Sequence, residues 1–213
     1  MLTKVNSSHK LISDNRYIKI RSATPPDLES IVNLENEIWS EDQRCSRENF
    51  MTRLLIFSEG FLLAEDQDSN LVGTFFCVKR NFTLNKGGYS WDSESGFGSG
   101  LSHTQGANGL FGVSATVHPN APKGTLRNLF DGWHEVANRN GLKYIFGGSR
   151  IPGLINFEGT PDAYLQNILD KSLFDPVLSK YMACNLKVGI LLPNYFDDME
   201  SHNYGVEVYD VID

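Results

Sequence analysis

Apolar positions recur along the chain with two spacings, which separate expected strands from expected helices. Alternation and short apolar runs predict strands over residues 17–21, 61–65, 71–79, 110–117, 143–147, 186–192 and 204–212. Spacings of three and four residues predict helices over residues 27–39, 46–57, 126–137, 160–169 and 175–184. Strands and helices alternate without a linker, so we expect a single domain over residues 17–213.

Two segments fall outside these periodic patterns. Residues 1–16 are polar and predict a loose N-terminal lead-in. Residues 85–109 contain seven glycines in 25 positions, which predicts a long loop or a ragged hairpin. Because long loops in compact domains are either functional or disordered, both readings of residues 85–109 stay open.

Composition and charge narrow the class of protein. Hydrophobic residues make up 40% of the chain and charged residues 21%, which is globular composition. The net charge of −7 argues against a nucleic-acid partner and against a basic membrane-surface protein. The charge is uneven, because residues 117–155 have a net charge of +3 and residues 156–213 a net charge of −7. An anionic ligand therefore suits the middle of the chain.

The cysteines and the N-terminus indicate a reduced compartment. Cys45, Cys77 and Cys184 lie far apart, without the spacing of a metal or redox site. We expect three free thiols, no bound metal and a cytoplasmic protein. The polar N-terminus has no apolar core of a secretory signal, and no apolar run is long enough to span a membrane.

One strand–loop–helix segment, residues 111–130, carries the clearest chemical signal. A glycine-containing loop before a helix directs backbone N–H groups toward an anion, and Lys123 and Arg127 add positive charge there. The order Lys123-Gly124-Thr125 is not that of a Walker A loop, and no GxGxxG pattern is present. Taken alone, the segment is equally compatible with an ordinary crossover connection.

The residues and their order together resemble the GNAT superfamily of acyl-CoA-dependent N-acyltransferases. The similar segments are 18–28, 61–65, 71–73, Val117-His118-Pro119 with the Gly124 loop, 141–143 and 181–186. This resemblance implies an α/β (α+β) fold in which helices flank a twisted, mixed but mostly antiparallel sheet of six to seven strands. It implies acetyl-CoA or another acyl-CoA as co-substrate.

A narrower resemblance involves two kinds of GNAT domain. Trp39, residues 44–46, residues 57–60, residues 150–153 and residues 175–179 are similar to the GNAT domain of bifunctional GNAT/carbon-nitrogen hydrolase proteins. Since the sequence stops at Asp213, we expect the domain without a hydrolase part. GNAT-like decarboxylase domains that load polyketide synthases are similar around Trp39 and residues 57–60.

The resemblance assigns the binding of acyl-CoA to one strand and its loop. Ala115, Thr116 and Val117 match the strand whose backbone pairs with pantetheine. The family's pyrophosphate loop, R/Q-x-x-G-x-G/A, corresponds to residues 121–126, where only the central glycine is retained and Pro122 removes a donor. The residues implied in cofactor binding are Ala115, Thr116, Val117, Lys123, Gly124, Thr125, Leu126 and Arg127.

The implied catalytic residues match the family only in part. Tyr181 matches a tyrosine that serves as general acid, although Asn185 and Leu186 replace the Gly and Phe of that pattern. Ser114 stands where family members often carry a glutamate base, and it could orient a water. His118 titrates near neutral pH and is a second candidate, with an ordinary loop histidine as the alternative.

The candidates for substrate recognition are three aromatic residues. Trp39, Tyr89 and Trp91 are candidates for an acceptor pocket, whereas Glu35 and Glu37 fit a solvated helix face. The expected reaction is acetyl transfer to the amine of a small molecule or peptide, by a monomer or homodimer. The alternatives are a GNAT-like decarboxylase or S-acyltransferase that acts on a malonyl or acyl thioester or an acyl carrier protein, and a non-catalytic binding protein.

Overall fold

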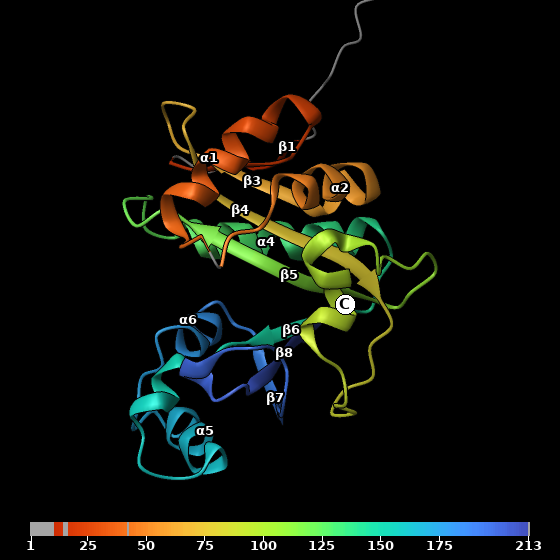
Figure 1. Cartoon of the computed structure of the whole chain (residues 1–213). Coiled ribbons are helices and arrows are strands. Elements are labelled where there is room, and N and C mark those ends of the chain that lie inside the picture. Colours follow the sequence, from red (N-terminus) through yellow and green to blue (C-terminus); the bar gives the residue numbers. More distant parts are fainter. Residues whose placement is uncertain (1–10, 15–16, 42, 213) are drawn as a thin grey trace, which may run out of the picture.

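The computed structural model describes residues 11–14, 17–41 and 43–212 (Figure 1). One sheet of eight strands extends through these residues, in the order β1-β2-β3-β4-β5-β6-β8-β7. Neighbouring strands are antiparallel except for β5 and β6, which are parallel. The strands are β1 (Leu11–Asp14), β2 (Lys19–Ser22), β3 (Phe61–Glu65), β4 (Leu71–Arg80), β5 (Gly109–Val117), β6 (Tyr144–Ser149), β7 (Lys187–Leu192) and β8 (Gly205–Val211).

Helices cover both faces of this sheet. The predicted α/β class with a mixed, mostly antiparallel sheet is confirmed, and each predicted strand and helix forms within a few residues of its expected bounds. The strand count exceeds the expected six to seven because β1 forms inside the segment expected to be a lead-in. The helices are α1 (Leu28–Ile38), α2 (Arg47–Phe57), α3 (Trp91–Ser95), α4 (Thr125–Arg139), α5 (Pro161–Leu169) and α6 (Leu178–Ala183).

The alternation of side chains along the strands divides the core into two clusters. In β3, Leu62 and Ala64 belong to the cluster that contains Trp133 of α4. Phe61 and Leu63, one position away, belong to the cluster that contains residues of α1 and α2. Successive strand residues point to opposite faces, so this alternation places α4 on one side of the sheet and α1 and α2 on the other (Figure 1).

The glycine-rich segment 85–109 is built of defined turns rather than open loop. Ser90 caps α3 by accepting a hydrogen bond from the backbone N–H of Ser93, and Gly96 ends α3 with φ of 62°. Gly100 has φ of 88°, and a Cβ atom there would lie 2.8 Å from the Phe76 ring. The glycines therefore allow residues 96–100 to pack closely against the sheet.

Strand β5 separates from β6 after a short shared ladder. The two strands pair only from Gly109 with Tyr144 to Phe111 with Phe146, and they diverge beyond that point (Figure 1). On its other side β5 stays paired with β4 as far as Val117, with a bulge at Val113. One edge of residues 112–117 therefore faces a gap in the sheet instead of a strand.

The described residues lack two kinds of feature. None of their helices combines the length and the apolar character needed to cross a membrane. None of their His, Cys, Asp and Glu side chains gather in a group of three or more that could hold a metal ion.

Candidate active site

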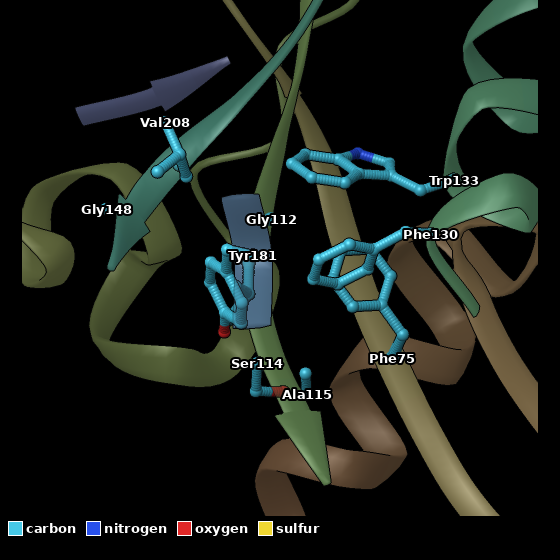
Figure 2. A pocket seen from close by; sticks show the side chains of 11 residues that line it. Phe75, Gly112, Ser114, Ala115, Phe130, Trp133, Gly148, Tyr181 and Val208 are labelled. Atoms are coloured by element: carbon cyan, nitrogen blue, oxygen red, sulfur yellow. The ribbon is translucent and has the colours of Figure 1, made fainter. Parts of the chain in front are cut away.

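A cleft of about 640 Å³ opens where β5 leaves β6. Its inner end continues into a pocket of about 40 Å³ between β5, β6 and α4 (Figure 2). Cationic and anionic side chains both line the wide part of the cleft. The small inner pocket is lined mainly by apolar residues and glycines. The predicted site residues that line the cleft are Trp39, Trp91, Ser114, Ala115, Thr116, Val117, Leu126 and Tyr181.

Tyr181 stands at the inner end of the cleft. Its ring packs edge-on against Phe130 of α4, with ring centroids 5.1 Å apart, and Figure 2 shows its hydroxyl oxygen on the side of Ser114. Burial raises the pKa of the Tyr181 phenol to about 12, and the nearby Cys184 thiol adds to this effect. The phenol therefore stays protonated at neutral pH, which suits a proton donor.

Thr116 is fixed between two side chains of the first helix region. The indole Nε1 of Trp39 donates to Thr116 Oγ1 over 2.9 Å, and Thr116 Oγ1 donates to Glu35 Oε2 over 3.0 Å. The second oxygen of Glu35 accepts from the backbone N–H of Cys45 at 2.9 Å. The expectation of a solvated Glu35 is therefore wrong, because its side chain is 8% exposed. The sequence signal for this burial is that Glu35 follows the apolar Ile31 by four residues, which places both on the same face of the helix.

Arg53 of α2 is a site residue that sequence reasoning did not find. It is 2% exposed, and its guanidinium lies 5.1 Å from the Phe50 ring centroid and 4.9 Å from that of Phe76. Nε donates to the carbonyl of Gly98 over 2.8 Å, and Nη1 donates to Ser114 Oγ over 3.0 Å. The available signal was its place three residues after Phe50, on the apolar face of α2.

The two aromatic candidates of the glycine-rich segment have different surroundings. Trp91 lines the cleft and donates from Nε1 to the carbonyl of Val113, 2.8 Å away, at the bulge of β5. Tyr89 does not line the cleft, and its hydroxyl donates to Glu207 Oε2 over 3.0 Å beside the Phe146 ring. The structure thus brings Trp91 and Trp39 to the site and leaves Tyr89 half-buried against the core.

Comparisons with known proteins show which curated sequences resemble this chain. The chain matches no family model. It is 28% identical over 202 residues to the uncharacterized N-acetyltransferase YkwB of Bacillus subtilis, covering 89% of this chain and 86% of that protein. It is also 25% identical over 189 residues to the probable hydrolase YhcX of the same organism, covering 87% of this chain but only 37% of that protein.

Solved structures share the fold over nearly the whole chain. The loading GNATL domain of CurA from Lyngbya majuscula superposes with a TM-score of 0.76 at 21% identity, covering 92% of this chain and 98% of that one. The GphF GNAT-like decarboxylase in complex with isobutyryl-CoA gives a TM-score of 0.73 at 22% identity, covering 91% and 99%. The chain therefore has the GNAT fold.

The loop before α4 is held by a glycine turn and by side chains that bond to backbone carbonyls. Gly124 precedes α4 with φ of 93°, and the Thr125 hydroxyl donates to the carbonyl of Pro122 over 2.7 Å. The Arg127 guanidinium donates to the carbonyl of Ala183, and Lys123 is exposed. Within the described chain, the first-turn N–H groups of Leu126 and Arg127 have no backbone acceptor, so they can receive an anion.

His118 is not among the residues that line this GNAT cleft. Its Nε2 lies 3.0 Å from Glu37 Oε1, and its Nδ1 accepts from the backbone N–H of Asn120 at 3.1 Å. The acceptor role of Nδ1 places the proton on Nε2, which then donates to Glu37. The structure therefore separates His118 from Tyr181 and Ser114, with which sequence reasoning had grouped it.

Proposed function

We propose that this protein transfers an acyl group from an acyl-CoA to an amine in the cleft between β5 and β6. The observation that carries the proposal is the unpaired edge of β5 at residues 112–117. A strand edge offers a row of N–H and C=O groups to any extended chain with amide groups. Pantetheine carries two amides, so Ala115, Thr116 and Val117 would hold it by backbone hydrogen bonds.

The residues present fit CoA more closely along pantetheine than at the phosphates. Leu126 and Arg127 offer free N–H groups at the start of the 15-residue helix α4, and Lys123 adds an exposed charge. Pro122 has no N–H, and the N–H of Thr125 is bonded to the carbonyl of Pro122. We therefore propose that the pyrophosphate contributes less to binding than pantetheine does.

The chemistry would follow from the position of Tyr181. The amine nitrogen attacks the thioester carbonyl, the C–S bond breaks, and the departing thiolate takes the proton of the Tyr181 hydroxyl. The positively charged nitrogen of the new C–N bond releases its proton to solvent, and the Tyr181 phenolate takes up a proton from solvent before the next turnover. Ser114 already accepts a hydrogen bond from Arg53, so its hydroxyl proton is free to orient a bound group.

A second candidate function is decarboxylation of a malonyl-type thioester, with or without acyl transfer to a carrier protein. It is favoured by the fold that this chain shares with the GphF GNAT-like decarboxylase and with the loading GNATL domain of CurA. This function needs no amine acceptor.

Calorimetry and turnover together test these functions. Acetyl-CoA and malonyl-CoA are titrated into the protein, and release of free thiol is then followed with and without a panel of amines. Amine-dependent thiol release with an acylated product supports the first function. Conversion of malonyl-CoA to acetyl-CoA without an amine selects the second. Binding without any turnover leaves a non-catalytic binding protein, and absence of binding contradicts both enzymatic proposals.

A further inference from the structure

Arg53 has more hydrogen-bond donors than the protein around it uses. Its side chain carries five N–H bonds. One on Nε bonds to Gly98 and one on Nη1 bonds to Ser114, and no acceptor for the others is found in the described part of the chain. Arg53 also lines the cleft, so these remaining donors border the space in which a substrate would lie.

Among the described residues no carboxylate lies within ion-pair distance of Arg53. Burial lowers the pKa of Arg53, and the nearby charge of Glu35 offsets only part of that cost. Two carboxylates at the cleft are bonded elsewhere. Glu35 accepts from Cys45 and Thr116, and Asp198 accepts from Arg150 in a bidentate pair at 2.8 Å. Arg150 thus neutralises Asp198 and Glu200 within the acidic segment of residues 197–200.

Two other carboxylates, Asp92 and Asp197, also line the cleft without forming an ion pair with Arg53. The rings of Phe50 and Phe76 lie close to the guanidinium and offset a small part of the free-energy cost of burying its charge. A buried charge without a full counter-charge is costly, and a bound anion would relieve that cost. The planar fork of an arginine matches the two oxygens of a carboxylate.

We infer that the substrate group bound beside Arg53 carries a carboxylate, which accepts hydrogen bonds from the free guanidinium N–H groups of Arg53. The inference rests on the proposed function, because it specifies the substrate of the same cleft. The carboxylate could belong to the acyl group of the donor or to the amine acceptor. Both sources present the same chemistry to Arg53, and the experiment separates them.

The test compares paired substrates that differ in one carboxylate. In the donor arm, thiol release is measured with malonyl-CoA and succinyl-CoA against acetyl-CoA and butyryl-CoA. In the acceptor arm, acetyl-CoA is combined with glycine, aspartate and glutamate against glycinamide, asparagine and glutamine. The proteins are the wild type, Arg53→Gln, Arg53→Lys and the control Arg47→Gln. Arg47 is an exposed residue of α2 that pairs with Glu29 outside the cleft.

We expect the wild type to prefer the carboxylate member in one arm, which identifies the source. Arg53→Gln should reduce that preference, measured as a ratio of kcat/KM values, by about 30-fold. Arg53→Lys should retain part of it, because the charge remains and the fork is lost. Arg47→Gln should leave the ratio unchanged. Thermal unfolding followed by circular dichroism shows whether each variant is folded, and the Lys variant provides the test if the Gln variant is not.

Three results overturn the inference. The wild type could turn over CoA esters without preferring a carboxylate in either arm, in which case the proposed function stands and this inference fails. Arg53→Gln could lower kcat/KM equally for both members of each pair, which is the result of a purely structural role in joining α2, Gly98 and Ser114. If the wild type neither binds nor consumes any CoA ester, the proposed function fails and this inference fails with it.

Discussion

The two walls of the cleft are held together in different ways. The acceptor wall, formed by α1, α2 and residues 91–98, is tied to β5 by side-chain hydrogen bonds between residues far apart in sequence. These bonds span 77 residues for Trp39 and Thr116, 61 for Arg53 and Ser114, and 22 for Trp91. The donor wall, formed by residues 118–127 and α6, has no such side-chain bond to β5 in the described part of the chain. Its loop is closed by contacts across three or four residues, such as Thr125 with Pro122 and Asn128 with Gly124, and its side chains Arg127 and His118 bond to Ala183 and Glu37.

This difference separates two tasks of the proposed enzyme. The donor wall presents backbone groups, which any chain with the right turn can offer, and one phenol. The acceptor wall presents particular side chains held in place by distant partners. We expect changes in the donor wall to alter the rate and the affinity for CoA. Changes in the acceptor wall should alter the choice of substrate and the stability of the site.

The largest expected effect comes from Tyr181→Phe. Loss of the phenol removes the proposed proton donor, so kcat should fall about 100-fold while KM for the acyl-CoA stays within a factor of two. Steady-state thiol release measures both constants. Tyr209→Phe is the matched control, since Tyr209 lies in β8 and does not line the cleft. Unchanged turnover in Tyr181→Phe would remove this residue from the chemistry.

The raised pKa of Tyr181 predicts how kcat depends on pH. Burial raises this pKa to about 12 in the folded protein, above its ordinary value near 10. The neutral phenol is therefore retained as pH rises through 10, and kcat should show no loss from this group below about pH 11. The same shift makes its contribution to stability complete below pH 10 and decreasing between about pH 10 and 12. An alkaline loss of kcat centred at pH 10 that disappears in Tyr181→Phe would contradict this assignment.

A smaller effect is expected from Glu35→Gln on the acceptor wall. An amide can accept from Cys45 or from Thr116 through one oxygen only, so Thr116 should lose its fixed orientation. We expect turnover to fall about 10-fold, measured as kcat. Glu37→Gln is the control on the same helix, where the carboxylate contacts His118. An equal loss in Glu37→Gln would instead support a catalytic role for His118.

Trp91→Phe should weaken the attachment of residues 91–98 to β5. Phenylalanine keeps an aromatic ring but leaves the carbonyl of Val113 without its indole donor at 2.8 Å. The free energy of unfolding should fall by about 1 kcal/mol, as measured by urea denaturation. An unchanged midpoint would mean that water replaces the indole at this carbonyl.

The smallest effect is expected from Lys123→Ala on the donor wall. Lys123 is exposed, so its attraction for the phosphates of CoA is screened by salt. The Kd for CoA should rise by about two-fold at low salt and by less at high salt, as measured by calorimetry. A ten-fold rise would show that charge, and not pantetheine, dominates binding.

Features that depend on neighbouring residues could be predicted from the sequence, whereas contacts between distant residues could not. The strands, the helices and the turn at Gly124 follow from local periodicity and from turn residues, so they could be placed without a structure. Tyr181 could be found through its resemblance to a family pattern. The prediction of a loose lead-in up to residue 16 was wrong for β1, because the pairing of Leu11 with Arg21 is a contact between strands.

Arg53 and Glu35 show the limit of local reasoning. Charged residues on helices are usually solvated, and their burial depends on partners 61 and 81 positions away. Likewise, the glycines at positions 96, 98 and 100 look like flexible loop in sequence. Their role depends on neighbours in the fold, which are the backbone of residues 101–102 beside Gly96, Trp91 beside Gly98 and Phe76 beside Gly100. Tyr89 and Trp91 could not be told apart for the same reason.

The short ladder between β5 and β6 has a mechanical consequence. Among the described residues, the strand ladder between the half-sheet of β1–β5 and the half-sheet of β6, β8 and β7 has three residue pairs, from Gly109 with Tyr144 to Phe111 with Phe146. We expect a bulky ligand that widens the cleft to strain this ladder. Amide hydrogen exchange at residues 109–111 and 144–146 would then report the strain that a ligand places on the fold.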